Sequence, residues 1–204
     1  MQSLMDLLGS MLFGGAMLSI ILSANDIASE NQSVYNGDLL VQEMLVQTAY
    51  LVEGEFRNMG VGVPDNGQIV LTADTSTIRF LYDVDRNGTP DTVAYTMGTV
   101  ADMAGTQNPI DRPLFRRVNG GTAARIGVVT TFNLRYLTRT GDIMATPVAA
   151  NRLSEVHSVE ITMEVQNPYA VISSGGAIEG SVDNALYSNT LWQQTRLASQ
   201  NSRR

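Results

Sequence analysis

The spacing of hydrophobic positions changes once along the chain, near Gly60. Before it, eighteen uncharged residues from Leu7 to Ala24 are followed by a segment whose apolar residues recur at intervals of three, four or seven residues. This spacing, with no proline before Pro64, predicts one helix from about Ser3 to Met59, about 85 Å long. The residues on its apolar face are Ile27, Val34, Val41, Leu45, Thr48, Val52, Phe56 and Met59, and its acidic residues, Glu53 and Glu55 among them, are expected on other faces.

After Gly60 the period becomes two, which is typical of β-strands. The strands predicted are Gln68–Leu71, the hairpin Thr77–Tyr82 with Thr92–Met97, Leu114–Val118, Arg125–Leu137 and Val156–Val165. A glycine-rich loop is expected at Ser173–Ser181, and a last strand or short helix at Ala185–Ala198. The aromatic residues expected in the sheet core are Tyr82, Tyr95, Tyr136 and Trp192.

Together these elements predict an α+β fold, with a long N-terminal helix packed on an antiparallel β-sheet head. The expected segments are an apolar membrane or filament-core helix over 1–24, its amphipathic continuation over 25–60, and a β-rich head over 61–204.

The apolar run has three interpretations: a cleaved secretory signal, a buried core helix, and a membrane-resident helix. A secretory signal needs a basic start, and no Lys or Arg occurs before Arg57. Eighteen uncharged residues are long for a soluble core helix, so a membrane helix is favoured. Asp6 begins the run, either as an interfacial carboxylate near the helix N-terminus or as a partner for a neighbouring subunit's amine.

Composition narrows the function classes. The net charge of −7 argues against nucleic-acid binding, because such partners need a basic face. Without cysteine there is no thiol chemistry or disulfide, and without lysine there is no Schiff base or P-loop lysine. The single histidine, His157, shares strand parity with buried-type residues and is expected to be structural. The sequence therefore predicts that the chain is not an enzyme.

Several stretches in order resemble the larger minor pilins and pseudopilins of the type IV pilin-like family. They are the start Gln2–Leu8, the helix end Glu55–Pro64, Thr77–Tyr82 with its hairpin partner, Leu114–Gly120, Gly127–Tyr136 and Val156–Glu164. Two features depart from the family pattern: Asp6 stands where the family carries glutamate, and no basic leader ending in glycine precedes Gln2. The resemblance therefore implies a chain already processed, or a branch without a leader.

The resemblance implies a bacterial structural subunit, held in the cytoplasmic membrane before assembly and then part of an extracellular filament on the cell surface. Its partners would be copies of itself or other pilin-like subunits. Assembly would use the apolar helix, through Asp6, Leu7, Leu8, Leu12, Phe13, Leu18, Ile20 and Ile21. The alternative is a single-span anchored binding domain that uses the loops 98–121 and 173–181.

One motif suggests a cofactor. Residues 83–91 have the spacing D-x-D-x-N-G-x-x-D, in which alternate oxygen-bearing residues of a tight loop can face one cation. The candidate calcium ligands are Asp83, Asp85, Asn87, Asp91 and the backbone carbonyl of Thr89. Because Ala94 stands where an EF-hand has its last glutamate, the expected affinity is weak. The alternative is a hairpin turn in which Asn87-Gly88 supplies positive φ. No other cofactor is expected.

Overall fold

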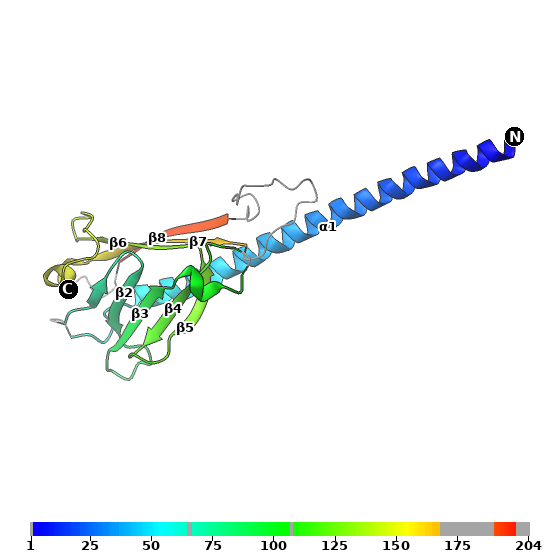
Figure 1. Cartoon of the computed structure of the whole chain (residues 1–204). Coiled ribbons are helices and arrows are strands. Elements are labelled where there is room, and N and C mark those ends of the chain that lie inside the picture. The colour runs from blue at the N-terminus through cyan, green and yellow to red at the C-terminus, as the bar shows by residue number, and fades with distance from the viewer. Residues whose placement is uncertain (1, 65–66, 107, 168–189, 199–204) are drawn as a thin grey trace.

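A computed structural model describes residues 2–64, 67–106, 108–167 and 190–198. One long helix, α1 (Gln2–Arg57), projects from a β-rich head, and only its C-terminal half packs against that head (Figure 1). The described strands form a five-stranded and a three-stranded sheet. The α+β class predicted from the sequence is therefore confirmed, with two antiparallel sheets in the head instead of one.

The helix ends where the sequence predicts, at Arg57, two residues before Met59. The chain then turns through Gly60 and Gly62, whose φ angles of 81° and 79° lie in the region that glycine adopts without steric cost. Gly62 also passes close to Asp83, because a Cβ at Gly62 would lie 2.8 Å from the Cβ of Asp83. The turn after the helix and the segment that begins at Asp83 are therefore held against each other.

The larger sheet has its strands in sequence order, each antiparallel to the next. Its strands are β1 (Val70–Ala73), β2 (Thr77–Tyr82), β3 (Asp91–Met97), β4 (Arg112–Val118) and β5 (Ala124–Val129). A 3-10 turn, η1 (Val100–Met103), lies between β3 and β4. One face packs on the helix: the ring of Phe56 lies 5.1 Å from that of Phe80 and 5.4 Å from that of Tyr95, between centroids.

The smaller sheet has the order β6–β7–β8, with β6 (Thr131–Leu137), β7 (Ser158–Gln166) and β8 (Thr190–Ala198). A second 3-10 turn, η2 (Ala150–Glu155), precedes β7. The inward residues predicted for β7 are buried, as expected from their alternation: Val159, Ile161, Met163 and Val165.

The single strand predicted over Arg125–Leu137 is wrong, because the structure divides it into β5 and β6 in different sheets. The division lies at Thr130, whose backbone N–H donates to the carbonyl of Glu164 at 2.9 Å. The buried positions also change there from odd-numbered to even-numbered residues: Val129 is fully buried and Val128 half-buried, whereas Phe132 is buried after the bend. The apolar alternation continues on both sides of this bend, so the sequence carries no sign of it.

The core position predicted for Trp192 is also wrong, because its side chain is 66% exposed. Strand β8 is an edge strand, and its residues Gln193 and Thr195 face the helix, where both donate hydrogen bonds to Glu53. Trp192 has the opposite parity and therefore points away from the helix. Tyr82, Tyr95 and Tyr136 are buried as predicted, while residues 173–181 and 185–189 lie outside the described residues.

Candidate assembly helix and carboxylate loop

The N-terminal half of α1 has no protein around it. The segment Met5–Ser29 is long and apolar enough to cross a membrane, with a mean hydropathy of 1.9. No residue of its most apolar 18-residue stretch is buried by the rest of the protein. The expected assembly residues Leu7, Leu8, Leu12, Phe13, Leu18, Ile20 and Ile21 are 53% to 78% exposed. The interpretation of this segment as a buried core helix within one chain is therefore wrong.

A polar stretch separates the apolar segment from the head. Described side chains from Met5 to Asn36 are exposed, apart from the half-exposed Gly9, and burial begins at Gly37 and Val41. From there the apolar face predicted from the sequence is buried: Val41, Leu45, Thr48, Val52, Phe56 and Met59. Ile27, predicted on the same face, is 60% exposed because the helix has not yet reached the head.

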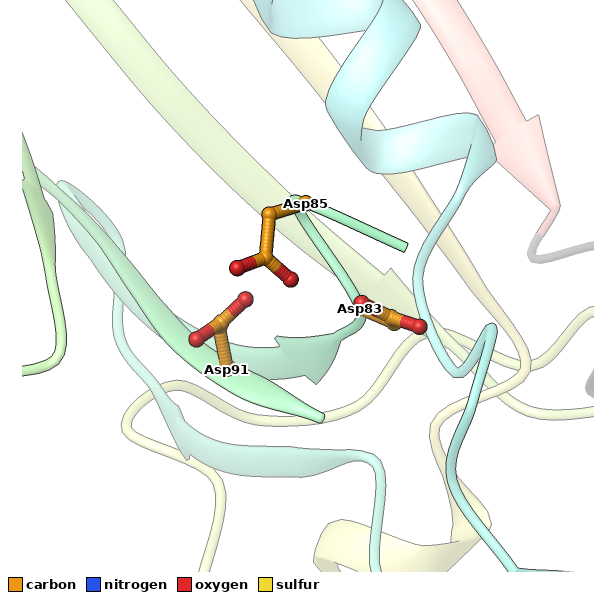
Figure 2. Close-up of side chains that lie close together, drawn as sticks. All are labelled: Asp83, Asp85 and Asp91. Carbon is orange, nitrogen blue, oxygen red and sulfur yellow. The ribbon is translucent and has the colours of Figure 1, made fainter. Parts of the chain in front are cut away.

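The carboxylates of Asp83, Asp85 and Asp91 come together after β2, with one oxygen of each lying within 4.8 Å of the others. Figure 2 shows the carboxylates of Asp85 and Asp91 directed toward each other, with Asp83 to one side of them. Asp83 accepts hydrogen bonds from the backbone N–H groups of Asn87 (3.0 Å) and Gly88 (2.8 Å). These bonds fold the loop tightly around the first aspartate.

The remaining predicted calcium ligands are placed differently. The amide oxygen of Asn87 accepts from the backbone N–H of Thr89 at 2.7 Å, and its amide nitrogen donates to Asp85 at 2.9 Å. Asp91 accepts from the backbone of Val84 at 3.0 Å. The loop uses positive φ at Gly88 (87°), as a turn requires, and also at Arg86 (59°). Carboxylate oxygens suit a hard cation such as calcium. Asn87 and the three aspartates all make hydrogen bonds within or beside the loop.

A buried carboxylate at the end of α1 was not found by the sequence analysis. Glu55 is 8% exposed and accepts hydrogen bonds from Tyr82 (2.6 Å), from Tyr95, and from the guanidinium of Arg116, whose Nε lies 2.8 Å from one carboxylate oxygen. The expectation that Glu55 faces away from the core is wrong. The carboxylate joins the helix to β2, β3 and β4 at once.

The charges of this cluster are compensated. Burial alone would raise the pKa of the Glu55 carboxyl, but hydrogen bonds from Arg116, Tyr82 and Tyr95 outweigh it and hold that pKa below its ordinary value. Burial, together with the neighbouring carboxylate, raises the pKa of Tyr95 and of Tyr82. Both phenols therefore stay protonated and donate their hydrogens to Glu55 at neutral pH.

Neither a protein-family model nor a curated protein sequence matches the chain. Among solved structures, a type IV-like pilin from Thermus thermophilus is similar, with a TM-score of 0.48 and 12% sequence identity. The alignment covers 80% of this chain and 97% of that one.

A signal for the Glu55 cluster does exist in the sequence. Glu55 is three residues after Val52 and four before Met59, so it falls on the apolar face of the helix rather than beside it. Arg116 shares strand parity with Leu114, so it too lies on the core side of β4. A charged residue at an inward position of each of two packed elements indicates a buried pair.

Proposed function

We propose that this chain is a structural subunit of a pilin-like filament. The observation that supports the proposal most directly is the apolar half of α1, which projects beyond the head with its side chains uncovered. In this proposal the segment Met5–Ser29 lies in a membrane before assembly and packs against neighbouring subunits afterwards. The head then faces outward, as the visible surface of the filament.

The hydrophobic effect makes this half of the helix require a partner. Covering about 1,000 Å² of apolar surface contributes about 25 kcal/mol before entropy costs, at about 25 cal/mol per Å². The glycines at positions 9, 14 and 15 have no neighbour within 4 Å of an added Cβ, so they leave room for close approach of another helix. Small residues of this kind are typical of helix interfaces in membranes.

Site-specific cross-linking tests the assembly, because the chain contains no cysteine of its own. Ile20→Cys places a thiol on the exposed apolar helix, and Thr140→Cys places a matched one on an exposed loop of the head. In cells that produce the full chain, oxidation is expected to link Ile20→Cys copies into disulfide-bonded dimers, because each copy has one thiol and neighbouring helices bring two of them together. Thr140→Cys copies should stay largely monomeric.

Deletion of residues 2–24 provides the second arm of this test. The truncated chain is expected in the soluble fraction as a monomer, whereas the full chain is expected to sediment with membranes or filaments. Equal extraction and sizing of the two chains, or equal cross-linking at both cysteine positions, would contradict the proposal.

A single-span anchored binding domain is the second candidate function. It shares the membrane segment but requires no contact between subunits, and its binding surface would include the part of residues 98–121 that lies outside β4. Electron microscopy of membranes from producing cells separates the two functions. Filaments that carry the chain support a subunit role, and dispersed single copies support an anchored domain.

For the carboxylate loop we propose weak calcium binding by Asp83, Asp85 and Asp91. The convergence of the three carboxylates supports it, because their mutual repulsion in a tight turn is relieved by a divalent cation. Backbone carbonyls and water would have to complete the six to eight oxygen ligands that calcium takes. Such a site would stabilise the head without any role in chemistry, and we infer no catalytic function for the chain.

A further inference from the structure

The outer face of the larger sheet, opposite the helix, carries a groove of about 520 Å³. It is lined from β2, β3 and β4 and from the turn that follows β4. The lining residues are Thr77, Arg79, Thr92, Ala94, Thr96, Phe115, Arg117, Gly120 and Ala123. Its size lies within the range of small-ligand sites.

The strand register explains the shape of the groove. Ala94 on the central strand β3 pairs with Arg79 on one side and with Arg117 on the other. Because one strand separates β2 from β4, the backbones of Arg79 and Arg117 lie about 10 Å apart, and only the methyl group of Ala94 lies between the two side chains. The adjacent row places Thr96 between Thr77 and Phe115. A small floor is thus flanked by two guanidiniums and bordered by hydroxyls and an aromatic ring.

Within the described part of the chain, the two guanidiniums have no charge partner. Arg79 and Arg117 are exposed, and neither makes an ion pair or a side-chain hydrogen bond with any residue in the described part of the chain. None of the described residues that line the groove is acidic. In a chain of net charge −7, this face therefore presents two uncompensated positive charges at one place. Guanidiniums bind carboxylates and other planar anions by two parallel hydrogen bonds.

We propose that this groove binds an acidic oligosaccharide, a sugar chain that bears carboxylates such as a polyuronate. Arg79 and Arg117 hold the carboxylates, and the sugar backbone crosses Ala94 between them. The hydroxyls of Thr92 and Thr96 bind the sugar hydroxyls, and the half-buried ring of Phe115 provides an apolar wall. The site is a property of the head alone, so it applies whether or not the chain assembles.

Two other anionic partners fit the groove less well. A nucleic acid requires a broad basic surface, whereas this chain is acidic overall and offers two arginines here. A peptide that docks on a sheet gains backbone hydrogen bonds at an open strand edge, but β3 is paired on both sides. Sugars bind instead through hydroxyl groups and ring faces, which are the groups that this sheet face presents.

Calorimetric titration of the full chain tests the proposal, in micelles of a polyoxyethylene detergent that contains no sugar. The probes are a galacturonic acid trimer, a neutral galactose trimer and a glutamate tripeptide. The uronate is expected to bind at least about tenfold more tightly than the neutral trimer, because charge-assisted hydrogen bonds are lost with the carboxylates. It should also bind more tightly than the peptide, which carries the same kind of charge without the sugar rings.

Variants of the full chain assign the binding to this groove. Arg79→Gln and Arg117→Gln should each weaken uronate binding about tenfold, and Ala94→Leu should weaken it by filling the floor. Arg139→Gln, at an exposed arginine outside the groove, is the matched control and should bind as the natural chain does. Thermal melting checks that each variant folds. If Ala94→Leu does not fold, the two arginine variants decide the result.

Three results would overturn the proposal. The first is no uronate binding, or equal binding of the acidic and neutral trimers. The second is an equal loss of affinity in Arg139→Gln and in the two groove variants, which would mean a general charge effect. The third is tighter binding of the glutamate peptide, which would assign the groove to acidic proteins instead. Filament formation is measured separately, so failure here leaves the proposed assembly untouched.

Discussion

Removing the charge of Glu55 tests whether the buried cluster holds the helix to the head. Glu55→Gln keeps the size of the side chain and one acceptor oxygen, but it leaves the guanidinium of Arg116 without its counter-ion. The side chains of Arg116 and Glu55 are 21% and 11% exposed, so water replaces little of the lost interaction.

The expected cost follows from this burial. Breaking a fully buried ion pair by removing one partner costs about 3–5 kcal/mol, and the partial exposure of Arg116 lowers this to about 2–3 kcal/mol. For a chain of this size, such a loss lowers the melting temperature by about 4–12 °C. Glu43→Gln is the matched control: Glu43 is exposed on the same helix and hydrogen-bonded to Gln47, and its loss should cost less than about 0.5 kcal/mol.

Near-ultraviolet circular dichroism of the tyrosines is the suitable signal, because Tyr82 and Tyr95 lie in the cluster, whereas the apolar segment Met5–Ser29 contains no tyrosine. The folded pKa of Glu55 lies below its ordinary value of 4.5, so its contribution is complete above pH 4.5 and is lost as the pH falls through the folded value. The natural chain should therefore lose more stability on acidification than Glu55→Gln does.

A double-mutant cycle provides the refutation. Arg116→Met is expected to destabilise the head, and combining it with Glu55→Gln should cost at least about 1 kcal/mol less than the sum of the two single changes. Additive costs, together with a Glu55→Gln effect no larger than that of Glu43→Gln, would show that the cluster does not anchor the helix.

Three further predictions concern other carboxylates. Calcium at 1 mM should raise the melting temperature by about 3–6 °C if its Kd is about 10⁻⁴ M. Asp83→Asn combined with Asp85→Asn should abolish this increase. Equal melting temperatures in calcium and in chelator would identify the loop as a simple turn. Asp6→Ala should leave melting unchanged but lower incorporation into filaments, measured by their subunit content; natural incorporation would remove its role in assembly. Asp111 is 1% exposed, and among the described residues no donor lies within hydrogen-bond distance of its carboxylate oxygens. Burial raises the pKa of its carboxyl above 3.8, and the Thr106 hydroxyl offsets this only in part. Asp111→Asn should therefore stabilise the chain by about 1 kcal/mol at pH 7. As the pH falls toward 3.8, the carboxyl of the natural chain becomes protonated, so the two chains should then have the same free energy of unfolding, measured by denaturation at each pH.

The elements with a clear period could be predicted from the sequence. The helix was placed to within two residues at each end, and β2 was placed at its observed bounds, Thr77–Tyr82. These segments place apolar residues on one face over many turns or pairs, so local pattern and burial agree. The gathering of Asp83, Asp85 and Asp91 also followed from their spacing, because the loop that holds them is short.

What the sequence did not reveal depends on contacts between distant segments. The bend at Thr130 arises because β5 and β6 pair with different strands, and the apolar alternation does not register it. The exposure of Trp192 depends on which face of β8 meets the helix. The groove between Arg79 and Arg117 requires the register of three strands, which no single stretch of sequence specifies.

The contact between Glu53 and β8 has a consequence for the order in which the protein matures. The two donors to that carboxylate, Gln193 and Thr195, follow it by 140 and 142 residues. Glu53 is therefore synthesised well before the strand that covers this part of the helix. Such long-range closure is slow, because a large loop must form before its contacts contribute. The part of the helix around Glu53 therefore stays uncovered until β8 has been made.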